Sequence, residues 1–163
     1  MNTYQENAKP VFSPYFSSYF ALCISSLCAL SAASFASTPW QAASVDACLA
    51  AGNCFSAQRE HELALRFFRR AAELDPQCAY AHTLAAHEHV ACEDFERATT
   101  RYRHALRIDA RHYNAWFGLG LVYFRQEKHQ LAVYHFQRAI RIHARSSVLH
   151  CYLGMVLHAA KRR

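Results

Sequence analysis

The side chains best suited to chemistry in this chain of 163 residues are its seven cysteines and eleven histidines. Both types bind zinc, and cysteine is also a nucleophile, but each use requires a particular spacing. The chain has no C-x-x-C pair, and His82, His87 and His89 lack the i, i+4 spacing that places two zinc ligands on one helix face. The sequence therefore predicts no metal site, and we expect buried, reduced cysteines.

Motifs for nucleotide binding or acyl transfer are also missing from the sequence. There is no P-loop, no G-x-G-x-x-G and no nucleophile elbow, and four glycines in the whole chain leave little material for a loop that cradles phosphate. We therefore predict a protein that is not an enzyme and needs no cofactor.

Three segments of the chain match one another when the sequence is shifted by 34 residues. Each carries a small residue, an alanine, an aromatic residue and a second alanine at the same offsets. The copies are Gly52, Ala64, Phe68, Ala71; then Ala86, Ala98, Tyr102, Ala105; then Gly120, Ala132, Phe136, Ala139. This period and pattern are typical of the tetratricopeptide repeat, in which antiparallel helix pairs stack into a solenoid. Three copies in register argue against an ordinary helical bundle.

We predict an all-α solenoid of tetratricopeptide helix-turn-helix units, with repeats at residues 45–78, 79–112, 113–146 and a partial repeat at 147–163. The small residues let neighbouring helices approach, and the aromatic residues fill the space between helix pairs. Further residues assigned to packing and turns are Pro76, Trp116, Tyr123 and Gly154. The apolar residues of the partial repeat (Leu149, Leu153, Val156 and Leu157) should be partly exposed, as in a piece of a longer array.

The N-terminal segment differs in composition from the repeats. Residues 10–45 contain no charged side chain and are rich in Ser, Ala and Phe. We interpret residues 1–40 as a leader that is disordered, weakly helical or foreign to the domain. A signal peptide or membrane anchor is the alternative, although the many serines suit a membrane span poorly.

Charge is distributed unevenly along the repeats. Residues 46–96 carry nine acidic and four basic side chains, whereas residues 97–163 carry two acidic and thirteen basic ones. A basic half can bind acidic peptide or RNA, and a stand-alone basic adaptor is the alternative function. Arginines that decorate solvated helix faces are the preferred explanation of this charge. The aromatic residues occupy packing offsets rather than a stacking platform, so we do not expect nucleic-acid binding.

The concave side of such an array is lined by the first helix of each pair. On this basis the predicted peptide-binding groove consists of Asn53, Ser56, Tyr80, Thr83, His87, Asn114, Phe117 and Leu121. The asparagines would hydrogen-bond the backbone or carboxylate of an extended peptide, and Phe117 and Leu121 would form an apolar pocket. Alternatively, Asn53 and Asn114 bond neighbouring helices and hold the stack together.

Several segments outside the general repeat pattern carry a more specific resemblance. They are Gly52–Ser56, Gln58–His61, Asp75–Pro76, Ala79–Ala81, His87–Glu88, Arg111–Gly120, Gln126–Lys128 and Ser146–Leu149. Together they resemble the C-terminal repeat array of the anaphase-promoting complex subunit 3 family, from about Asp46 onward. The chain departs from that family at Cys48, Ala86, His89, Ala110 and Ala144, and its first 45 residues do not match.

The resemblance implies a scaffold subunit of a multisubunit ubiquitin ligase, found in nucleus and cytoplasm and active in cell division. Its implied partners are the other tetratricopeptide subunits of the complex and a WD40 coactivator. The groove would receive the C-terminal Ile-Arg tail of that coactivator, while other subunits transfer ubiquitin. No membrane partner is implied.

Overall fold

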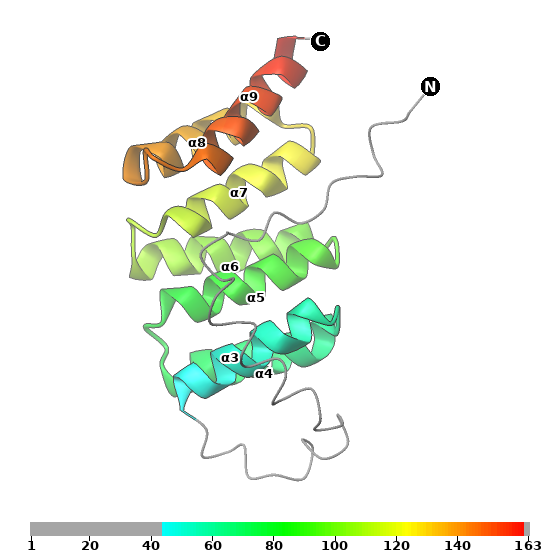
Figure 1. Cartoon of the computed structure of the whole chain (residues 1–163), viewed down its shortest axis with the longest axis vertical. Coiled ribbons are helices and arrows are strands. Elements are labelled where there is room, and N and C mark those ends of the chain that lie inside the picture. The colour runs from blue at the N-terminus through cyan, green and yellow to red at the C-terminus, as the bar shows by residue number, and fades with distance from the viewer. Residues whose placement is uncertain (1–43, 162–163) are drawn as a thin grey trace. The chain divides into compact units, whose positions relative to one another are not determined.

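The computed structural model describes residues 44–161, which form seven α-helices and no strand (Figure 1). The helices are α3 (Val45–Ala57), α4 (His61–Leu74), α5 (Ala79–Ala91), α6 (Phe95–Ile108), α7 (Tyr113–Arg125), α8 (His129–Ile142) and α9 (Ser147–Lys161). The helices α3, α5, α7 and α9 begin 34 residues apart, as the sequence period requires. The predicted all-α tetratricopeptide fold is confirmed. The predicted leader, residues 1–40, lies outside the described residues.

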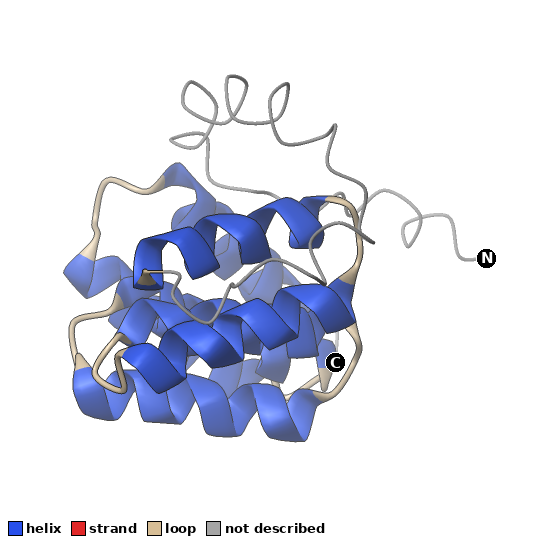
Figure 2. Cartoon of the chain, turned by 90° about the horizontal axis from the view of Figure 1, so that it is seen from below, coloured by secondary structure: helices blue, strands red, loops and turns tan. Residues whose placement is uncertain are grey.

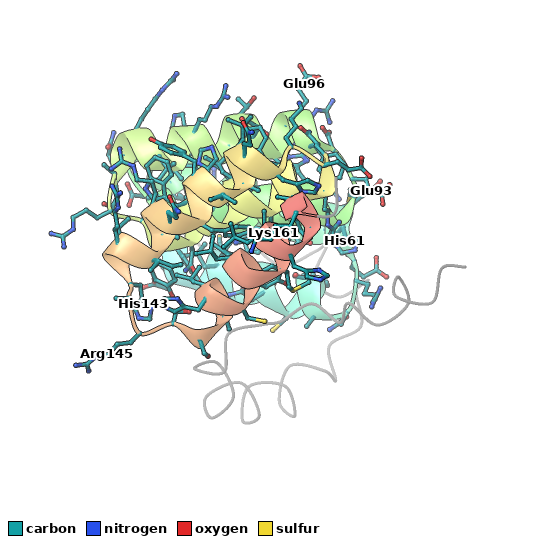
Figure 3. The ribbon with its side chains drawn as sticks, turned by 90° about the horizontal axis from the view of Figure 1, so that it is seen from above. His61, Glu93, Glu96, His143, Arg145 and Lys161 are labelled. Atoms are coloured by element: carbon teal, nitrogen blue, oxygen red, sulfur yellow. The ribbon has the colours of Figure 1, made fainter. Side chains whose placement is uncertain are left out.

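Consecutive helices pack as pairs, α3 with α4, α5 with α6, and α7 with α8, and short loops join them (Figure 2). His61 and Glu93, near the turns inside the first two pairs, lie at one side of the stack (Figure 3). His143 and Arg145, in the turn that follows α8, lie at the opposite side. The helices of a pair are therefore antiparallel, and each pair presents its first helix on the same face.

The residues at the alanine and aromatic offsets form the interior of this stack. Each of these residues is at most 1% exposed: Ala64, Phe68, Ala71, Ala98, Tyr102, Ala105, Ala132, Phe136 and Ala139. Alanine leaves room for the neighbouring helix, and the aromatic ring fills the gap that remains. A 34-residue period of small and large side chains thus becomes a period of closely packed layers.

Glycine is required where an aromatic ring touches the opposite helix of its own pair. A Cβ atom on Gly52 would overlap the ring of Phe68, and one on Gly120 would lie 2.7 Å from Cε1 of Phe136. Any larger side chain would push the two helices of the pair apart.

The middle pair, α5 and α6, accommodates its aromatic ring in a different way. Ala86 occupies the glycine offset and is fully buried. The ring of Tyr102 instead lies against Gly118 of the next pair, where a Cβ atom would come within 2.6 Å of the tyrosine hydroxyl oxygen. Gly118 therefore compensates for Ala86, and the close approach of the ring to a glycine lies between α6 and α7.

The other predicted packing residues have mixed outcomes. Trp116 is partly buried and donates from Nε1 to the Ala110 carbonyl at 3.0 Å, while Tyr123 stacks on His135 with ring centroids 5.1 Å apart. Pro76 is exposed in the loop between α4 and α5. The packing role expected for Gly154 is wrong, because that residue is exposed and a Cβ there meets no atom within 4 Å.

The apolar residues of α9 also differ from expectation. Leu149 and Val156 are 2% and 0% exposed, so half of the predicted exposed set is buried. Val156 packs against Ala132 and Phe136 of α8. Leu157, by contrast, is 44% exposed. Even without a second helix among the described residues, α9 buries one full face on the preceding pair.

The turn inside each pair repeats a left-handed residue. Arg59, Glu93 and Glu127 have φ angles of 63°, 62° and 60°, and each lies two residues beyond the end of a first helix. The left-handed region costs energy for every residue with a Cβ atom and suits glycine. These turns therefore carry strain that a glycine would remove.

Replacing Glu93 by glycine should raise the free energy of unfolding by about 0.5–1 kcal/mol, because relief of the left-handed strain outweighs the greater entropy of the unfolded chain. Urea denaturation of the full chain measures this change. Glu96→Gly is the matched control, since it places the same residue inside α6 and should lower stability by about 0.5–1 kcal/mol. Loss of stability in both variants would show that the turn is not strained.

Candidate peptide-binding groove

The eight predicted groove residues lie on the first helices of the three complete pairs. Asn53 and Ser56 belong to α3, then Tyr80, Thr83 and His87 to α5, and Asn114, Phe117 and Leu121 to α7. Helix α5 contacts α7 directly, so the groove residues of these two helices are neighbours on one face of the stack. We call this face the first-helix face.

Asn53 and Asn114 are the two amides on the first-helix face. Both are partly exposed, and neither side chain has a hydrogen bond to another residue within the described part of the chain. They therefore do not tie neighbouring helices together, which was the alternative interpretation. Each amide offers two N–H donors and one carbonyl acceptor to a ligand.

Two apolar residues of α7 lie on the same face. Phe117 is partly buried, and its ring meets Tyr152 of α9 edge-on at 5.1 Å and Phe136 of α8 at 5.7 Å. Leu121 is also partly buried and packs against the cluster that contains Tyr102. Both residues expose part of an otherwise packed side chain, as an apolar subsite requires.

Thr83 does not belong to the accessible groove. It is 1% exposed, and its hydroxyl donates to the Ala79 carbonyl one helical turn earlier at 2.9 Å. The fifth residue of this repeat therefore points into the stack, and the prediction of ligand contact by Thr83 is wrong. Ser56 is partly exposed, but its hydroxyl is already committed to Glu88.

His87 and Tyr80 are held by neighbouring rings. His87 Nδ1 forms a 2.8 Å hydrogen bond with the Tyr102 hydroxyl, and the two rings meet edge-on. Burial, and secondarily the charge of His112, lower the pKa of His87 to about 4, so the ring is neutral at pH 7. Tyr80 meets His112 edge-on at 6.4 Å, and burial raises its pKa. These two residues shape the first-helix face without adding charge to it.

Glu88 is a buried acid to which sequence reasoning assigned no role. It is 5% exposed, accepts from Ser56 Oγ at 2.6 Å, and pairs with His61 Nδ1 at 2.7 Å. The three residues come from α5, α3 and α4, so they lock the first pair to the second. A sequence signal existed, because the equivalent residues of later copies are Val122 and Val156.

Replacing His61 alone should lower stability more than replacing His61 and Glu88 together. His61→Ala leaves the buried carboxylate with one donor and should lower the free energy of unfolding by about 2–3 kcal/mol. Adding Glu88→Val removes the stranded carboxylate and restores the side chain found in later copies, so the double variant should recover at least half of the loss. Chemical denaturation measures both, and a double variant less stable than His61→Ala would contradict this view of the lock.

Two further site types receive no support from residues 44–161. No group of three histidine, cysteine, aspartate or glutamate side chains gathers there as metal ligands would. Among the same residues, no helix combines the length and apolar character needed to cross a bilayer.

Comparison with known proteins agrees with the repeat geometry. Sequence profiles described as tetratricopeptide repeat match residues 45–78 and 83–147. Among solved structures, the first repeat domain of Spaghetti (RPAP3) bound to HSP90 peptide SRMEEVD has a TM-score of 0.67, covering 72% of this chain and 93% of that one at 16% identity. The Arabidopsis OM64 repeat domain also scores 0.67, covering 71% and 95% of the two chains at 16% identity. The chain belongs to the tetratricopeptide repeat family.

Within that family the chain is similar to one subunit of a cell-division complex. It is 49% identical over 109 residues to "Anaphase-promoting complex subunit 3" of Schizosaccharomyces pombe and 54% identical over 113 residues to "Cell division cycle protein 27 homolog B" of Arabidopsis thaliana. These matches cover 67% and 69% of this chain but 16% and 15% of the relatives. The predicted resemblance to subunit 3 is confirmed, and the chain spans about one sixth of the relatives' length.

Proposed function

We propose that this chain is a non-enzymatic scaffold segment of the anaphase-promoting complex. On this proposal its first-helix face receives the C-terminal Ile-Arg tail of a WD40 coactivator, and its other surfaces contact other tetratricopeptide subunits in nucleus and cytoplasm. The observation that carries the proposal is that the side-chain amides of Asn53 and Asn114, on a face that is otherwise packed, bond no other described residue. The choice of the anaphase-promoting complex as the assembly is supported by the similarity to subunit 3.

The chemistry of the face suits such a tail. Asn53 and Asn114 can donate to the terminal carboxylate and to backbone carbonyls, which holds an extended chain without secondary structure of its own. The isoleucine side chain would fill the apolar subsite of Phe117 and Leu121. Asp46, an exposed carboxylate in the first turn of α3, offers a partner for the arginine.

Asn114→Ala should weaken binding of a fluorescent peptide ending in Ile-Arg about fivefold to tenfold, because a hydrogen bond to a charged group is lost. Fluorescence anisotropy on the full chain measures the affinity. The midpoint of thermal unfolding should stay nearly unchanged, since the amide bonds no other described residue.

Gln137→Ala is the matched control, because it removes an exposed amide from α8, a second helix, and should leave affinity intact. A peptide with an amidated C-terminus should bind less tightly than the free acid. A large drop in stability in Asn114→Ala, with unchanged affinity, would instead assign the amide a role in packing.

A second candidate is a stand-alone basic adaptor for acidic peptide or RNA, favoured by the arginine and aromatic cluster of α7 and α8. The Arg138 guanidinium lies 5.6 Å from the Trp116 ring and 5.7 Å from the Tyr134 ring, and Tyr134 is 49% exposed. The dependence of binding affinity on salt concentration distinguishes the two functions. Binding through phosphates falls steeply between 50 and 200 mM salt on the order of a thousandfold, whereas amide and apolar contacts in the groove should weaken far less.

A further inference from the structure

A shallow hollow lies where α4, α5 and α6 meet, away from the predicted groove. Its polar lining consists of Arg69 from α4, His82 and His89 from α5, and Arg101 from α6, over an apolar floor that includes Phe68 and Ala85. None of the eight predicted groove residues lines it. The hollow is therefore a second place where this stack could hold a ligand.

His82 is the buried polar group of the hollow. It is 6% exposed, and neither ring nitrogen has a hydrogen-bond partner of good geometry among the described residues. Burial and then the neighbouring His104 ring, 4.3 Å away, lower the pKa of His82, and the Pro76 carbonyl opposes this shift. A buried N–H without an acceptor is costly, so an acceptor entering the hollow would be stabilised.

The charge around the hollow is positive and not neutralised locally. Among residues 44–161, neither Arg69 nor Arg101 forms an ion pair with a carboxylate. Asp94, the acid beside His89, pairs with Arg97 at 3.3 Å and lies 3.9 Å from His89. Two guanidinium groups from different helices and a buried imidazole therefore line the same hollow, and no carboxylate of residues 44–161 pairs with either guanidinium.

The size of the hollow limits what can enter. Its volume is about 10 Å3, enough for one oxygen atom or water. A nucleotide or other whole metabolite does not fit inside. One oxygen of a tetrahedral anion could reach His82 while the remaining oxygens stay at the mouth, where a guanidinium can donate two parallel N–H bonds to a phosphate.

We propose that this hollow binds a single phosphate group carried on a phosphoserine or phosphothreonine side chain of a partner peptide. The small volume keeps the rest of the ligand outside, as a side chain of a macromolecule would be. At pH 7.5 a phosphate monoester carries close to two negative charges, which matches the two arginines.

The test uses the full chain at constant ionic strength and pH 7.5. A fluorescent pentapeptide with one phosphoserine among glycines should bind, its unphosphorylated form should not, and inorganic phosphate should compete. Arg69→Gln and Arg101→Gln should each weaken binding about tenfold. Arg66→Gln and Arg107→Gln, exposed on the same two helices, are the matched controls and should bind like the parent.

Three results would overturn the proposal. Equal affinity for the two peptides would show that phosphate is not recognised. Equal loss in the control and test variants would show that net charge alone attracts the peptide. Stabilisation of the chain by inorganic phosphate without peptide binding would assign the hollow to free phosphate. The arginines are surface residues, so these variants should fold and each result can be read.

Discussion

Gly118→Ala is expected to lower the free energy of unfolding by about 2–3 kcal/mol, although it adds a single methyl group. The added Cβ would overlap the Tyr102 ring, which is fully buried and therefore has no free space to move into. Relief would require α6 and α7 to separate, and that contact joins the second and third helix pairs. Chemical denaturation with a two-state fit measures the loss.

Two variants make this prediction specific. Gly154→Ala, in the equivalent helix of the last repeat, meets open space and should raise stability by about 0.5–1 kcal/mol. Ala86→Gly added to Gly118→Ala should recover at least half of the loss, because it reopens the site that the aromatic ring occupies in the first and third pairs. Equal effects of alanine at 118 and at 154 would refute this account of the close approach.

Acidification from pH 7 to pH 5 is expected to lower the free energy of unfolding by about 2–4 kcal/mol through His87 and His135. Burial lowers the pKa of each ring to about 4, helped by His112 near His87 and by Arg103 near His135. In the unfolded chain both rings take up a proton near pH 6.5, whereas in the folded chain they stay neutral until about pH 4. The unfolded state therefore binds more protons in this window, and stability falls as the pH falls.

His135→Phe tests this prediction in one residue. Phe67 occupies the equivalent position in the first repeat, and a phenyl ring preserves the stacking of His135 on Trp116 and Tyr123. The variant should lose about half of the acid-induced destabilisation and behave like the parent above pH 7. NMR can follow the ring signals of His135 in the folded parent. Titration of those signals near pH 6.5 would contradict the prediction.

The fold was predictable because the 34-residue period repeats side-chain volume as well as hydrophobicity. Alanine, aromatic and alanine at fixed offsets define which helix faces approach, and all nine such residues are buried. The compensation between Ala86 and Gly118 was not predictable from the period. It depends on which way the Tyr102 ring turns, and the repeat pattern does not specify that direction.

The candidate groove was predictable only in part. The register identifies the first-helix face, and Asn53 and Asn114 lie on it with amides that bond no other residue within 44–161. The register does not show whether a small polar residue reaches that face, and Thr83 instead bonds its own helix. The Glu88 lock depends on residues 27 and 32 positions away, so only the three-dimensional structure reveals it.

Recovery of the chain with its partners from dividing cells tests the scaffold proposal most directly. The full chain carrying an affinity tag is purified beside its Asn53→Ala, Asn114→Ala double variant, and bound proteins are quantified by mass spectrometry. We expect the parent to recover other tetratricopeptide subunits of the complex and a WD40 coactivator, and the variant to keep the subunits but lose most of the coactivator. Recovery of neither by the parent, or equal coactivator recovery by both, would contradict the scaffold proposal.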